Sequence, residues 1–70
     1  MKEDLAERAR MIAAEHIHVD EILTQKLGPF DEPNDAELFR IISDAVDELG
    51  NTAPADLLLL YADLKKVTGQ

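Results

Sequence analysis

The sequence contains no cysteine and no tryptophan, and it has only three prolines and three glycines among its 70 residues. Without cysteine the chain can form neither a disulfide nor a thiolate metal site. A domain of this length buries only about 60% of the surface that its unfolded chain exposes, so its hydrophobic stabilisation is small. We therefore expect stability to come from close helix packing, from oligomerisation, or from both.

Basic residues are also scarce, since seven lysines and arginines stand against fifteen acidic residues and give a formal net charge of −8. Such a surface repels the phosphates of nucleic acids and of anionic membranes, which predicts no direct nucleic-acid partner and no membrane partner. The longest apolar run, residues 57–62, is far shorter than the roughly 20 residues that span a bilayer. The first residues lack the apolar core of a signal peptide. Together these features predict a soluble, cytoplasmic protein.

Apolar residues recur every three or four positions in the first part of the chain, which predicts a long helix over residues 3–27. Only a helix brings residues with this spacing onto one face. Gly28 and Pro29 end the helix, because glycine suits a left-handed cap and proline cannot continue the helix. The inward residues of this helix are Leu5, Ala9, Ile12, His16, Val19 and Leu23.

Two further helices are predicted over residues 34–49 and 53–67. Asn34 precedes Glu37 by three residues, a pattern in which the two residues cap a helix start, and Gly50 ends the same helix. Pro54 is tolerated in the first turn of the third helix, where its missing N–H costs nothing. The inward residues of these two helices are Leu38, Ile42, Ala45 and Leu49, then Leu57, Leu60, Leu64 and Val67.

The predicted fold class is all-α: a single domain over residues 1–70, an up-down-up three-helix bundle with a long first helix. Short connections make neighbouring helices antiparallel. The first helix would be roughly 36 Å long, whereas the other two would be roughly 21 to 24 Å. Either the first helix frays or kinks, or its overhang packs on something outside the monomer.

Several large apolar residues fit none of the three inward faces, and a helix that is apolar all round is normally buried on more than one side. This surplus predicts a second contact surface, on another protein or on a second copy. Alternatively, Leu58 and Leu59 cover Phe30 of the loop or the overhanging first helix. The predicted protein interface consists of Met11, His18, Ile22, Leu58 and Leu59.

Acidic residues gather between positions 31 and 48, where seven of them stand against the single Arg40, a net charge of −6. An acidic face of this kind could imitate a row of phosphates and occupy a basic groove on another protein. It could equally be a solvated helix face with no partner. The predicted partner-facing acidic residues are Glu37, Asp44, Asp47 and Glu48.

No residue pattern predicts catalysis or a cofactor, so we do not expect an enzyme. Ser43 is the only serine, and it lies within a predicted helix, without the strained turn of a nucleophile elbow. Glu15 and His18 match the Glu-x-x-His element of ferritin-like di-iron bundles, but a monomer has a single copy of it. His16 is expected to be half-buried and to bond Asp20. The sequence therefore predicts no metal ligands in a monomer.

The leading hypothesis is a non-catalytic protein–protein interaction module: a small acidic helical adaptor, assembly chaperone or inhibitor that forms a homodimer. Burial of a helix face would supply affinity, and the acidic rim would set partner choice. The alternative is a nucleic-acid-mimicking inhibitor of a DNA- or RNA-binding protein, such as a phage-encoded anti-defence protein. A third possibility is an oligomeric ferritin-like metal site, with Glu37 or Glu48 as extra ligands.

Overall fold

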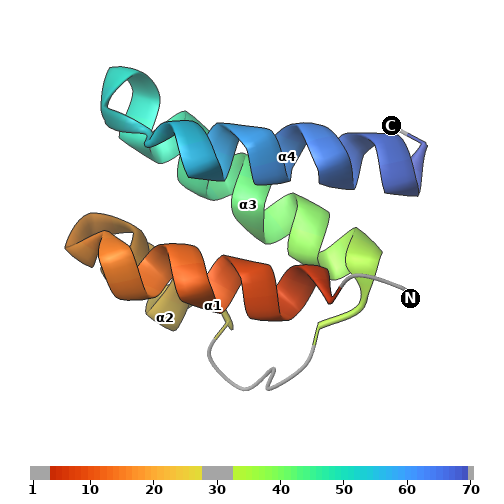
Figure 1. Ribbon diagram of the computed structural model, residues 1–70, viewed down its shortest axis with the longest axis horizontal. Coiled ribbons are helices and arrows are strands. Elements are labelled where there is room, and N and C mark those ends of the chain that lie inside the picture. Colours follow the sequence, from red (N-terminus) through yellow and green to blue (C-terminus); the bar gives the residue numbers. More distant parts are fainter. Residues whose placement is uncertain (1–3, 28–32, 70) are drawn as a thin grey trace.

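The computed structural model describes residues 4–27 and 33–69, which form four α-helices (Figure 1). They are α1 (Leu5–Glu15), α2 (Ile17–Leu27), α3 (Asp35–Leu49) and α4 (Ala55–Thr68), and a short 3-10 turn, η1 (Gly50–Thr52), precedes α4. The all-α fold class is confirmed. The three-helix, up-down-up arrangement is not, because the segment expected to form one helix forms two. Phe30, in the predicted loop, lies outside the described residues.

The prediction of one long helix over residues 3–27 is wrong, because the chain leaves the helical conformation at His16. This residue is extended, with φ −134° and ψ 104°. Its N–H donates to the carbonyl of Ala13 at 3.3 Å, and its own carbonyl accepts from the N–H of Asp20 at 3.0 Å. His16 therefore satisfies backbone groups at the end of α1 and at the start of α2.

The break keeps the molecule compact. Its longest dimension is 28 Å, shorter than a straight helix over residues 3–27 would be. The break lets Val19 and Leu23 of α2 enter the same core as Ile12 of α1. No proline or glycine marks the position, but His, Ile, His and Val at residues 16–19 all have below-average helix propensity. Of the two outcomes expected from the length mismatch, a kink and not an overhang is observed.

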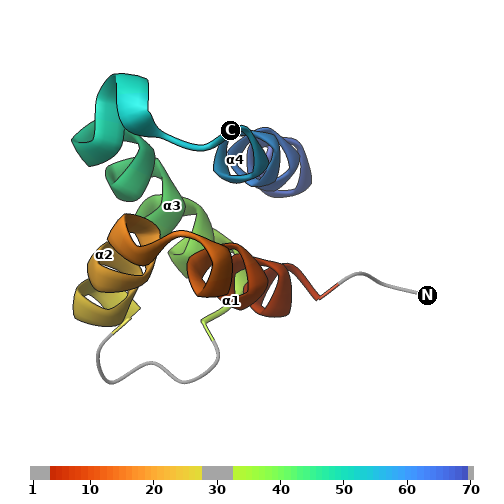
Figure 2. The same cartoon turned by 60° about the vertical axis from the view of Figure 1, so that its left-hand side comes forward.

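Helices α1 and α3 each contact the other three helices, and the most extensive packing is between α3 and α4. Helices α1 and α4 lie side by side and run in opposite directions, while the described parts of α2 and α4 do not touch (Figures 1 and 2). The side chains of Leu38, Ile42 and Ala45 on α3 are almost completely buried. The remaining core residues are Leu5, Ala9, Ile12, Ala13, Val19, Leu23, Leu57, Leu60 and Leu64.

Two predicted inward residues are placed differently. Val67 is 56% exposed, because it lies in the last turn of α4, beyond Leu64 and at the edge of the buried face. Leu49, at the end of α3, is half-buried and packs against the core. The inward faces were therefore predicted correctly in the middle of each helix and less well at the helix ends.

The boundaries of α3 follow from its caps. The side-chain oxygen of Asn34 accepts a hydrogen bond from the N–H of Glu37 at 2.8 Å, which confirms the predicted start of this helix. The Glu37 carboxylate accepts from the Asn34 side-chain amide at 3.2 Å, not from its backbone N–H. Gly50 ends α3 with φ +56°, a conformation that favours glycine. Because residues 50–52 then form η1, α4 begins at Ala55, two residues later than predicted.

Two adjacent leucines of α4 provide a test of this packing. Leu57 is fully buried, so Leu57→Ala should lower the free energy of unfolding by about 2 to 5 kcal/mol through lost burial and a residual cavity. Leu58 is 45% exposed, so Leu58→Ala should change it by less than about 0.5 kcal/mol. Urea unfolding followed by circular dichroism, at low protein concentration, measures both. Equal losses in the two variants would contradict the assigned orientation of α4.

Candidate functional site

Helix α4 is apolar on two opposite sides. Its buried side carries Leu57, Leu60 and Leu64, which are inaccessible to solvent. Four exposed apolar residues occupy the other side at the i, i+3, i+4, i+7 spacing of one helix face. We call this surface the α4 outer face, and it consists of Ala55, Leu58, Leu59 and Ala62.

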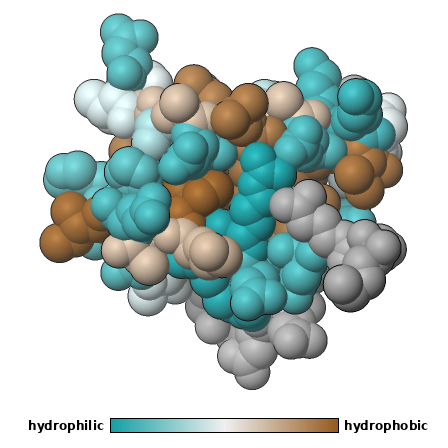
Figure 3. All heavy atoms as spheres, viewed as in Figure 1, coloured by the Kyte–Doolittle hydropathy of each residue, from teal (hydrophilic) through white to brown (hydrophobic). Residues whose placement is uncertain are grey.

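The exposed fractions of the leucines show that nothing in the described chain covers this face. Leu58 is 45% and Leu59 is 59% exposed. The space-filling view shows hydrophobic surface along α4 and between α4 and α1, surrounded by hydrophilic residues (Figure 3). The alternative that Leu58 and Leu59 cover the overhanging first helix is excluded, because α2 turns away at His16. Whether Phe30 approaches them falls outside the described residues.

A groove between α1 and α4 lies next to the α4 outer face. Its lining includes Met11, which is 65% exposed, and Asp56, which precedes Leu59 by about one helical turn. An ion pair between Arg8 of α1 and Asp63 of α4 joins the two helices. The complete lining of the groove is Arg8, Met11, Ile12, Glu15 and Asp56.

The predicted interface residues on the second half of the first segment are not part of this region. His18 and Ile22 lie on α2, which does not contact α4 in the described structure. His18 is exposed, whereas Ile22 is half-buried against the core. The break at His16 separates them from Met11. Sequence reasoning also missed Ile17, which is 70% exposed at the start of α2, because it assumed an unbroken helix there.

Two of the four predicted acidic residues on α3 already interact with other side chains of the same chain. Glu37 is half-buried and holds the helix cap with Asn34. A carboxylate oxygen of Glu48 lies 3.8 Å from the ammonium nitrogen of Lys26. Asp44 and Asp47 are exposed. A shallow hollow on this side is lined by Lys26, Glu37, Arg40, Ile41 and Asp44.

Because Lys26 and Arg40 lie in that hollow, positive side chains stand beside the acidic ones. A row of negative charges that imitates phosphates would be less continuous than the sequence suggests. The nucleic-acid mimic stays a prediction, with Asp44, Asp47 and Glu48 as its exposed members.

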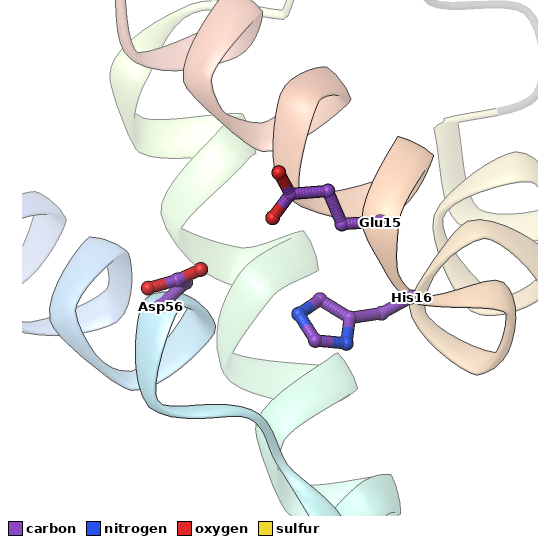
Figure 4. A group of neighbouring side chains, drawn as sticks. All are labelled: Glu15, His16 and Asp56. Atoms are coloured by element: carbon purple, nitrogen blue, oxygen red, sulfur yellow. The ribbon is translucent and has the colours of Figure 1, made fainter.

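Three side chains with metal-binding donors meet at one end of the α1–α4 groove. They are Glu15 at the end of α1, His16 at the break and Asp56 in the first turn of α4 (Figure 4). Their donor atoms all lie within 4.8 Å of one another. The expected side-chain bond between His16 and Asp20 is not observed, since Asp20 contacts the His16 carbonyl through its backbone N–H. Within residues 4–27 and 33–69, no hydrogen bond or ion pair involves these three side chains.

In the described part of the chain, no helix is both long enough and apolar enough to cross a membrane. The sequence matches no protein-family model, and searches of curated proteins and of solved structures likewise find no match.

The ion pair between Arg8 and Asp63 should contribute little to stability, because its side chains are 26% and 49% exposed. We expect Asp63→Asn to lower the free energy of unfolding by at most about 1 kcal/mol, and less at high salt. Urea unfolding at two salt concentrations measures this effect. Asp47→Asn, at an exposed position without an ion pair in the described chain, is the control. A loss well above that of a surface pair would show that this contact holds α1 and α4 together.

Proposed function

We propose that this protein is a non-catalytic protein–protein interaction module that forms a homodimer through the α4 outer face. The observation that carries this proposal is the second apolar side of α4, which offers Leu58 and Leu59 to solvent. Burying apolar surface contributes roughly 25 cal/mol per Å² removed from water. A chain of 70 residues has little core of its own, so such a surface is a favourable place for a second helix.

The α4 outer face is complementary to itself in an antiparallel arrangement. A two-fold axis that passes between Leu58 and Leu59 sets Ala55 against the partner's Ala62, and Leu58 against the partner's Leu59. The leucines then fill the centre of the contact. The alanines at both ends let the helix backbones approach within the 8 to 10 Å that is typical of packed helices. The same patch on both subunits is what a two-fold interface requires.

The distribution of charge makes the α4 outer face more favourable for a second copy of the chain than the other faces of the molecule. With a net charge of −8, two copies repel each other unless cations lie at the contact. Lys65 and Lys66 are exposed in the last turn of α4. Antiparallel pairing places these two lysines beside the N-terminal end of the partner's α4. The partner's Asp56 and the partner's Asp47 add negative charge at that end. The macrodipoles of two antiparallel helices are also favourably arranged.

The size of the contact sets the expected affinity. Helix α4 has 14 residues, a length of about 21 Å. A pair of such helices buries less than the roughly 1,200 Å² of a standard stable interface, which places the dimer among weak complexes with dissociation constants in the micromolar range. Weak self-association suits a small adaptor, assembly chaperone or inhibitor, in which a helix of another protein can replace the second copy.

Leu59→Lys tests the proposed face directly. A lysine at the centre of the contact places two charges against apolar surface, so the variant should stay monomeric at concentrations where the wild type dimerises. Analytical ultracentrifugation across a concentration series measures the mass of both proteins.

The matched control is Ile17→Lys, because Ile17 is equally apolar and 70% exposed but lies away from α4. It should dimerise as the wild type does, and both variants should keep the helical circular dichroism signal. A wild type that remains monomeric up to about 1 mM, well above the range of weak interfaces, would refute the homodimer. Equal disruption by both variants would refute this choice of face.

Reversing the two cations of α4 tests the arrangement of the dimer. The Lys65→Glu, Lys66→Glu double variant should weaken dimerisation by roughly tenfold or more, because two negative charges then meet the acidic end of the partner at each end of the contact. Lys26→Glu, a charge reversal on α2, is the control and should have a smaller effect. Unchanged dimerisation in the double variant would rule out the antiparallel arrangement.

A further inference from the structure

We infer that Glu15, His16 and Asp56 form a binding site for a divalent transition-metal ion of the Zn²⁺ type. This inference is independent of the proposed dimer. The three residues come from the end of α1, the break and the start of α4, and their side chains point toward a common space (Figure 4). The donor set is one imidazole nitrogen and two carboxylate oxygens.

The imidazole distinguishes this group from the ordinary acidic clusters of a surface with fifteen carboxylates. Zinc takes nitrogen from histidine and oxygen from aspartate or glutamate, and three protein ligands with one water complete a tetrahedral site. Calcium and magnesium prefer ligand sets made only of oxygen. The donors at this position therefore favour zinc, cobalt or nickel over calcium and magnesium.

The geometry needs only side-chain adjustment to hold such an ion. Donor atoms in a tetrahedral zinc site lie about 3.3 Å apart, given metal–ligand bonds of about 2.0 to 2.1 Å. Those of Glu15, His16 and Asp56 lie within 4.8 Å of one another. Glu15 and Asp56 are exposed, so rotation about their side-chain bonds can close the difference. His16 is half-buried, and two backbone hydrogen bonds fix its position.

The local charges are also compatible with a cation. The carboxylates of Glu15 and Asp56 lie close together, and in the described structure neither makes an ion pair that a metal would have to displace. Arg8 is the cation of the same groove, and its guanidinium binds Asp63. A metal at Glu15, His16 and Asp56 would connect the break between α1 and α2 to the start of α4, and so it would stabilise the folded chain.

Isothermal titration of tag-free protein with zinc chloride tests the site. We use a Leu58→Lys variant as the background, because position 58 lies at the centre of the proposed dimer but about 200° around the helix from Asp56, so that failure of the dimer does not affect the result. One ion per chain should bind with a dissociation constant in the micromolar range, and binding should raise the Tm. His16→Ala, Glu15→Gln and Asp56→Asn should each weaken binding by roughly tenfold or more. Cobalt should give the visible absorption of a site with a nitrogen ligand.

Matched controls come from α2, which carries the same residue types outside the group. His18→Ala and Glu21→Gln should change the affinity by less than about twofold, since neither side chain belongs to the group whose donor atoms lie close together. Magnesium chloride should give no binding in the same concentration range. Absence of zinc binding in a protein with normal helical circular dichroism would overturn the proposal. So would affinity that survives all three substitutions, or that falls as much with His18→Ala as with His16→Ala.

Discussion

The fold depends on the apolar face of α3, which packs against the other three helices. Helix α3 contacts α1, α2 and α4, and its Leu38, Ile42 and Ala45 are almost completely buried. A 70-residue chain has little core of its own, and each of the other helices packs against α3. The break at His16 lets both halves of the first segment do so. This packing also leaves the outer side of α4 without a neighbour, since the described helices are all on its other side.

The sequence predicted the helical class and most of the core, because apolar spacing alone determines which helix face is buried. Asn34 and Gly50 were correct boundary signals, since Asn34 acts through its side chain on the adjacent helical turn and Gly50 through its own backbone conformation. The break at His16 could not be predicted in the same way. It accompanies the packing of both half-helices against α3, and residues 16–19 carry neither proline nor glycine. The burial of Val67 was predicted wrongly for a similar reason, because the point along α4 at which the core ends depends on how the whole chain packs.

The candidate sites show the same difference between features that depend on one helix and features that depend on the packing of the whole chain. Leu58 and Leu59 were found from sequence because their exposure depends on the rotation of one helix, which the spacing of its leucines determines. The group of Glu15, His16 and Asp56 was missed, since Asp56 is distant in sequence and a continuous helix would place His16 in the buried seam. His18 and Ile22 were assigned to the same surface as Met11 for that reason too. Sequence reasoning was therefore accurate within a helix and inaccurate across a break.

The one-residue connection between α1 and α2 also constrains how this chain can vary. His16 is extended, so one residue added to or removed from this connection would shift the start of α2 by up to about 3.8 Å and change its direction. Val19 and Leu23 would then no longer fit against the core, although no core side chain had been replaced. The length of this connection is thus more tightly fixed than its composition. Related chains, whatever their residues here, would be expected to keep the spacing between Ile12 and Val19 unchanged.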